Sequence, residues 1–82
     1  MANYSIELDC APGFPRPGDL LSDILKDTGI NLDPDKPVST FFGNWIWEIS
    51  KDQEDLYQEK RDIIKERITK LYHDGAIRYG SW

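Results

Sequence analysis

The chain begins with polar and apolar positions in strict alternation. Over residues 4–10 every second side chain is apolar or cysteine, and the positions between them are Ser5, Glu7 and Asp9. A period of two is typical of a β-strand with one buried and one solvent-exposed face. Residues 11–18 follow with three prolines and two glycines, which oppose helix and remove backbone donors. The pattern therefore predicts a strand followed by a stiff, extended loop.

A short amphipathic helix is predicted after this loop. Between residues 20 and 28, the leucine and isoleucine side chains fall on one helical face. Asp19 is the predicted N-terminal cap. Gly29 is predicted to end the helix in the left-handed conformation, with Ile30 packing back against Leu25 as in a Schellman motif. Prolines return in residues 31–39, so that stretch is predicted to be irregular.

The most apolar stretch spans residues 40–50 and predicts a second strand that is largely covered on both sides. One face of this strand carries Phe41, Trp45, Trp47 and Ile49, and the other carries Phe42 and Ile46 with Asn44 and Glu48. Both faces hold large apolar side chains, so little of this strand is expected to face solvent.

A long amphipathic helix is predicted over residues 51–74. Ser50 and Gln53 have the spacing of a capping box, in which each side chain bonds the backbone amide of the other residue. The apolar stripe of this helix consists of Tyr57, Ile64, Ile68 and Leu71, widened by Leu56, Ile63 and Tyr72. Acidic residues gather at its start and basic residues at its end, which favours the helix dipole. Gly75 is the predicted stop.

The last residues, 76–82, alternate again and predict a short terminal strand or a tail packed through Trp82. The predicted element order is therefore β-α-β-α-β within one small domain spanning residues 1–82. We expect an α+β fold in which a three-stranded sheet carries one short and one long helix packed on one face, because that arrangement buries both helix stripes. The order of the strands within the sheet does not follow from the pattern.

The charge of the chain is unevenly distributed. Ten lysine and arginine residues stand against 15 acidic ones, giving a net charge of -5, and residues 1–50 hold eight acids and only three bases. This balance disfavours direct binding to nucleic acid or anionic lipid and favours a basic partner. The alternative interpretation is that the acids only keep a small protein soluble.

Candidate chemistry is sparse in this sequence. Cys10 is the only cysteine and His73 the only histidine, so we expect no internal disulfide, no metal site and no cofactor. The first residues lack the pattern of a signal peptide and no stretch is apolar enough to span a bilayer, so a cytoplasmic location is expected.

One short motif resembles a known catalytic loop. Residues 10–16 read C-A-P-G-F-P-R, and their Cys-x5-Arg spacing resembles the phosphate-binding loop of protein tyrosine phosphatases. The resemblance implies Cys10 as a nucleophile and Arg16 as a phosphate ligand. Pro12 and Pro15 depart from that pattern because they delete backbone amides that would hold the phosphate. The alternative, a half-buried cysteine at a strand end, leaves the chain without an enzymatic role.

A non-enzymatic binding protein that occupies a basic surface of another macromolecule is the function we expect. Asp19, Asp23 and Asp27, at four-residue spacing on the first helix, form the candidate interaction surface. It is completed by Asp33, Asp35, Trp45 and Trp47. For Trp45 and Trp47 the alternative is a place in the core.

The size and charge of the chain are similar to those of phage-encoded inhibitors and toxin-immunity proteins, a similarity of composition alone. The expected partner is a basic protein or a nucleic-acid-binding protein, to which this chain would bind as a nucleic-acid mimic. The chain itself is expected to bind neither nucleic acid nor membrane. Two other hypotheses stay open. One is an assembly subunit that forms a homo-oligomer through the long helix and strand edges. The more remote one is a phosphatase-like enzyme based on Cys10.

Overall fold

The computed structural model describes residues 3–11, 16–40 and 43–82 and contains the predicted β-α-β-α-β order. Its elements are β1 (Ser5–Cys10), α1 (Pro17–Leu25), β2 (Asn44–Glu48), the 3₁₀ turn η2 (Lys51–Gln53), α2 (Glu54–His73) and β3 (Ile77–Ser81). The α+β class, the three-stranded sheet and the pair of one short and one long helix are as predicted from the sequence.

The sheet is antiparallel, and its strand order is β2-β1-β3. In the β1–β2 ladder, Ile6 lies opposite Trp47 and Glu7 lies opposite Ile46. The register of β1 with β3 shifts between Asp9 and Cys10, where the ladder is irregular. The first strand of the chain is therefore the central strand of the sheet.

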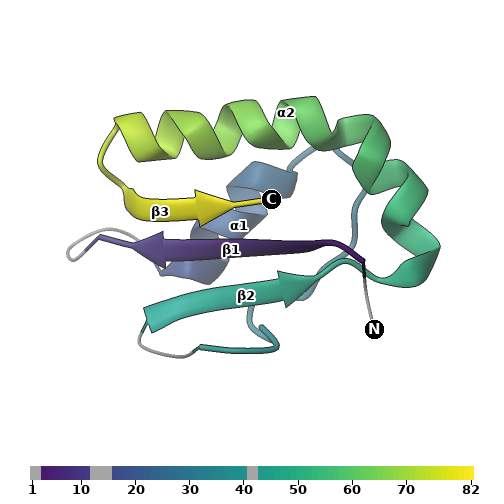
Figure 1. Cartoon of the computed structure of the whole chain (residues 1–82), viewed down its shortest axis with the longest axis horizontal. Helices are drawn as coiled ribbons and strands as arrows, with labels where there is room; N and C mark the ends of the chain where they lie inside the picture. The colour runs from purple at the N-terminus through teal and green to yellow at the C-terminus, as the bar shows by residue number, and fades with distance from the viewer. Residues whose placement is uncertain (1–2, 12–15, 41–42) are drawn as a thin grey trace.

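Both helices cover the same face of the sheet. Figure 1 shows α1 crossing behind β1 and α2 running alongside β3, with no helix in front of the three strands. The alternation of β1 places Ile6 and Leu8, both fully buried, on the helix side. The core also contains Trp47 and Tyr57, which are among the largest fully buried side chains. Among the described residues no helix covers the opposite face of the sheet, as the alternation of residues 4–10 predicts. The prediction that the second strand is covered on both sides is wrong, because on that face of β2 Asn44 and Ile46 are only partly buried and Glu48 is exposed.

Gly80 brings β3 close to α2. A Cβ atom at this position would lie 2.6 Å from the Cγ2 atom of Ile68. A Cβ atom does not fit there unless the Ile68 side chain shifts. The closeness of strand and helix at this point explains why β3 needs a glycine in its interior.

Helix α1 begins three residues earlier than the sequence predicts. Arg16, and not Asp19, is the N-cap residue, its side chain makes no capping hydrogen bond, and Pro17 opens the first turn. Proline is well suited to this position because its fixed φ matches the helix and its missing N–H is not needed there. Asp19 instead lies in the first turn, where a negative charge favours the helix dipole.

The end of α1 also differs from the prediction. The helix stops at Leu25, and both Asp27 and Gly29 adopt positive φ values, of 64° and 80°. Thr28 is buried and its hydroxyl donates to the Leu25 carbonyl at 2.7 Å, closing the helix end before Gly29 is reached. Ile30 nevertheless enters the core, as predicted.

The predicted capping box at the start of the long helix does not form. Residues 51–53 are a 3₁₀ turn, and the Ser50 side chain makes no capping bond. The Gln53 side chain accepts a hydrogen bond from the backbone amide of Asn31 at 3.0 Å instead. This glutamine therefore ties the loop after α1 to the start of α2.

The far end of α2 is a Schellman motif. The amide of Ala76 donates to the Leu71 carbonyl and the amide of Gly75 to the Tyr72 carbonyl, at 3.0 and 3.2 Å. Gly75 has a φ of 81°, so it ends the helix as predicted. The predicted apolar stripe is narrower than expected, because Ile63 and Tyr72 are exposed.

Candidate interaction surface

The structure separates the acidic row that the sequence placed on one helix. Asp19 and Asp23 lie in α1, but Asp27 lies two residues beyond its end with a left-handed backbone. The prediction of three aspartates on one helix is therefore wrong at Asp27. All three side chains are exposed, and none of them forms an ion pair within the described part of the chain.

Asp33 and Asp35, by contrast, have partners of their own. The Asp33 carboxylate accepts a hydrogen bond from the amide of Asp35 at 2.9 Å and lies 4.0 Å from the Lys36 ammonium. Asp35 pairs with Arg16 at 2.9 Å. These two aspartates therefore shape the loop after α1 and fasten it to the start of the helix.

The two tryptophans divide between core and surface. Trp47 is 1% exposed and its indole N–H donates to the Pro34 carbonyl at 3.3 Å, so a partner cannot reach it. Trp45 is partly buried and packs at a tilt against Trp47, with ring centroids 5.8 Å apart. The two rings therefore pack β2 and the loop before it against the core. Phe41 and Phe42, which the sequence predicts in the same strand, lie outside the described residues.

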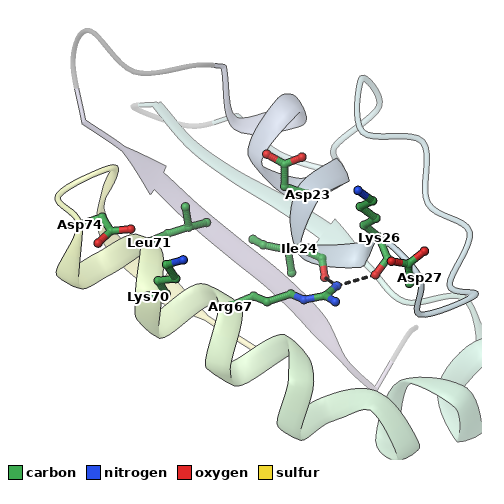
Figure 2. A pocket seen from close by; sticks show the side chains of 8 residues that line it. All are labelled: Asp23, Ile24, Lys26, Asp27, Arg67, Lys70, Leu71 and Asp74. Carbon is green, nitrogen blue, oxygen red and sulfur yellow. Dashed lines mark hydrogen bonds between the residues drawn. The ribbon is translucent and has the colours of Figure 1, made fainter.

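The end of α1 is fastened to α2 by an arginine. The Arg67 guanidinium extends from α2 and donates to the carbonyl oxygens of Ile24, at 2.8 Å, and Lys26, at 2.5 Å (Figure 2). The last carbonyls of a helix have no partner within the helix and carry partial negative charge. Arg67 thus supplies, from the second helix, the cationic cap that α1 lacks in its own last turn.

A groove separates the C-terminal parts of the two helices beside this contact. It has a volume of about 520 Å³. Its lining consists of Asp23, Ile24, Lys26 and Asp27 from α1 and the turn after it, and Arg67, Lys70, Leu71 and Asp74 from α2 and its cap. Figure 2 shows Ile24 and Leu71 pointing toward one another across the gap, with charged groups around them. Two of the acids singled out from the sequence therefore border a groove.

The remaining lining residues were not foreseen. In the sequence, nothing distinguishes Arg67, Lys70 and Asp74 from the other charged residues of the long helix. They follow α1 by 40 or more positions. Only the packing of α2 against α1 brings them beside Asp23 and Asp27. No local pattern could have identified them.

Cys10 is poorly placed for nucleophilic chemistry. It is partly buried at the end of β1, and burial, helped by the neighbouring charge of Asp9, raises the pKa of its thiol. Arg16, the other end of the motif, is engaged with Asp35, and residues 12–15 lie outside the described residues. A raised pKa reduces the thiolate fraction at neutral pH, which is the reverse of what a phosphatase loop requires.

Two further observations concern the described residues. Within them, no group of three or more histidine, cysteine or acidic side chains is arranged to hold a metal ion. Among the helices of the described residues, none has both the length and the apolar character needed to cross a bilayer.

The chain was also compared with known proteins. No protein-family model, no curated protein and no solved structure matches it.

Proposed function

We propose that this chain is a non-enzymatic binding protein that uses the acidic end of α1 to occupy a basic surface of another macromolecule. The interaction surface is defined by Asp19, Asp23 and Asp27. Of the acids singled out from the sequence, these three are exposed and unpaired among the described residues. The proposed protein is of the inhibitor or nucleic-acid-mimic type, as expected from the charge of the chain.

The observation that carries the proposal is the position of Asp23 and Asp27. Asp23 lies in the last turn of α1 and Asp27 lies just beyond it, at the negative end of the helix dipole. Asp23 also follows Asp19 by four positions, where like charges repel. Acids at these positions are unfavourable for the helix itself. A basic partner would turn the same positions into favourable contacts.

The test compares two variants of equal net charge. Asp23→Asn/Asp27→Asn removes two charges from the interaction surface, and Glu59→Gln/Asp62→Asn removes two from exposed positions of α2. The immobilised wild-type protein is used to capture partners from a cell lysate over a salt series, and the captured protein is purified for binding measurements. We expect a basic partner whose affinity falls with salt and falls by at least about tenfold in the α1 variant.

The control variant decides between this proposal and a general charge effect. It is expected to bind within about twofold of the wild type, because its charges lie outside the proposed surface. Equal losses in both variants would show that only net charge matters. Capture of no protein besides the chain itself would contradict the proposal.

A homo-oligomeric assembly subunit is the second candidate, and one observation favours it. Among the described residues β3 pairs with no strand other than β1, so it is an edge strand of the sheet. Edge strands can pair with a second chain. Sedimentation over a concentration series separates the two candidates, because assembly through β3 predicts a mass that rises above 9.5 kDa with concentration.

A further inference from the structure

The groove beside Asp23 has an apolar floor and a charged rim. Ile24 is 1% exposed and Leu71 is partly buried, and their side chains point toward one another across the gap in Figure 2. Ile24 is already covered, so the apolar surface that a chain segment could still bury in the groove is that of Leu71. A groove of about 520 Å³ has room for a long side chain.

The rim of the groove carries three acidic side chains, Asp23, Asp27 and Asp74, and three basic ones, Lys26, Arg67 and Lys70. Asp23, Asp27 and Asp74 contribute three carboxylates, and the C-terminal ends of both helices add partial negative charge. Arg67 is engaged with the carbonyls at the end of α1, and the Lys26 side chain points away from α2 in Figure 2. An apolar side chain would desolvate the carboxylates without replacing their hydration, and an anion would meet the same negative groups.

We propose that this groove receives one lysine or arginine side chain of the basic partner, with its methylene stem against Leu71 and its charge between the carboxylates of Asp23 and Asp74. The inference rests on the proposed function, because it names the chemistry by which the same surface recognises its partner. Lysine and arginine combine an apolar stem with a cationic head, which matches a floor and rim of this composition.

Lys70 is the internal competitor for this site. It lines the groove, is exposed, and no ion pair fixes its ammonium within the described residues. An incoming cation must displace or avoid this charge. Removing it by Lys70→Met is expected to strengthen binding, whereas a groove for an anion would be weakened by the same change.

The experiment is a titration of the full chain with short peptides, followed by the NMR signals of the Ile24 and Leu71 methyl groups. The probes are seven-residue glycine–serine peptides that carry one central lysine, arginine, norleucine or diaminopropionic acid. Lysine and arginine peptides are expected to shift both methyl signals. Norleucine has the stem without the charge and diaminopropionic acid the charge without the stem, so both are expected to bind at least about fivefold more weakly.

Matched variants locate the site. Asp23→Asn and Asp74→Asn are expected to raise the dissociation constant of the lysine peptide about threefold each, as for a partly exposed charge pair. Glu59→Gln removes one carboxylate charge from an exposed position outside both the groove lining and the interaction surface, so its effect is expected to stay below about 1.5-fold. Equal effects of Glu59→Gln and Asp23→Asn would overturn the inference, and so would equal binding of the norleucine peptide.

Failure of the groove and failure of the proposed function are distinguishable. If the captured partner loses affinity with Asp23→Asn/Asp27→Asn while no peptide shifts the two methyl signals, the acidic surface binds its partner without the groove. If the partner ignores that double variant as well, the proposed function fails together with the inference.

Discussion

Tyr57 shows at the scale of one residue how the core of this protein is built. Its side chain is fully buried against Tyr4, with ring centroids 5.3 Å apart, and the Arg61 guanidinium lies 6.0 Å from its ring centre. Its hydroxyl is buried and forms no hydrogen bond with any described residue. The ring contributes apolar packing, while the hydroxyl has lost its hydration without compensation.

Replacing this tyrosine by phenylalanine is therefore expected to stabilise the protein. Tyr57→Phe should raise the free energy of unfolding by about 1 kcal/mol, because an unsatisfied buried hydroxyl is removed. Tyr4→Phe is the control, since its hydroxyl accepts a hydrogen bond from Gln58 at 2.7 Å and its loss should cost about 0.5 kcal/mol. Urea denaturation measures both, and a clear loss of stability in Tyr57→Phe would show that the hydroxyl has a partner.

The stability difference between the wild type and Tyr57→Phe is expected to depend on pH. Burial, opposed by the charge of Arg61, raises the pKa of Tyr57 above its ordinary value of 10.0. Between the unfolded and folded pKa values the unfolded chain holds fewer protons, so stability falls as the pH rises. The wild type should therefore lose stability relative to Tyr57→Phe above pH 10.0 and keep a constant difference below it, as measured by urea denaturation at several pH values.

The thiol of Cys10 is expected to be unreactive. Burial and the charge of Asp9 raise the pKa of its thiol above the ordinary 9.0, so the thiol should react slowly with a disulfide reagent at neutral pH. Asp9→Asn removes the smaller of the two causes and is expected to lower the thiol pKa only in part. A thiol titration followed at 240 nm checks this, and a pKa below 9.0 in the wild type would reopen the phosphatase hypothesis.

At the scale of the elements, α1 depends on its neighbour. The short helix has no basic residue in its last turn, and its final carbonyls bond Arg67 of α2. Hydrogen bonds from a charged donor to otherwise unpaired carbonyls are stronger than average ones. The contact therefore fixes both the end of α1 and the width of the groove.

Truncation of this arginine is expected to be costly. Arg67→Met keeps an apolar stem but removes the guanidinium, and we expect a loss of about 1–2 kcal/mol in the free energy of unfolding. Hydrogen exchange at the α1 amides should increase more than exchange at β1. Lys70→Met, one turn further along the same groove lining, makes no such bond and is expected to change stability by less than about 0.5 kcal/mol.

The elements that the sequence predicted well are those with a local cause. The alternation in residues 4–10 and the stripe of the long helix follow from side-chain periods, and Gly75 ends the helix through its own backbone. The capping box failed because the Gln53 side chain bonds Asn31, 22 positions away. The groove could not be predicted at all, because it exists only where two helices distant in the sequence meet.

For the whole molecule, the uneven charge has a consequence for stability. Residues 1–50 carry all of the net charge, and the described acids that do form ion pairs are in loops or on the sheet. Asp23 and Asp27 remain unpaired at the end of α1 that disfavours them. Acids that bind a partner from these positions lower the stability of the free protein. Such a trade-off between stability and function is common at functional sites.

This relation predicts a variant that is more stable and binds less well. Asp23→Asn/Asp27→Asn removes the repulsion from Asp19 and the unfavourable contact with the helix dipole, and asparagine tolerates the left-handed backbone at position 27. We expect a gain of about 0.5–1 kcal/mol in the free energy of unfolding at low salt, shrinking as salt screens the charges. Glu59→Gln/Asp62→Asn changes the net charge equally without touching α1 and should give no comparable gain. A loss of stability in the α1 variant would mean that Asp23 and Asp27 stabilise the folded protein. The proposal that they bind a partner would then lose its main support.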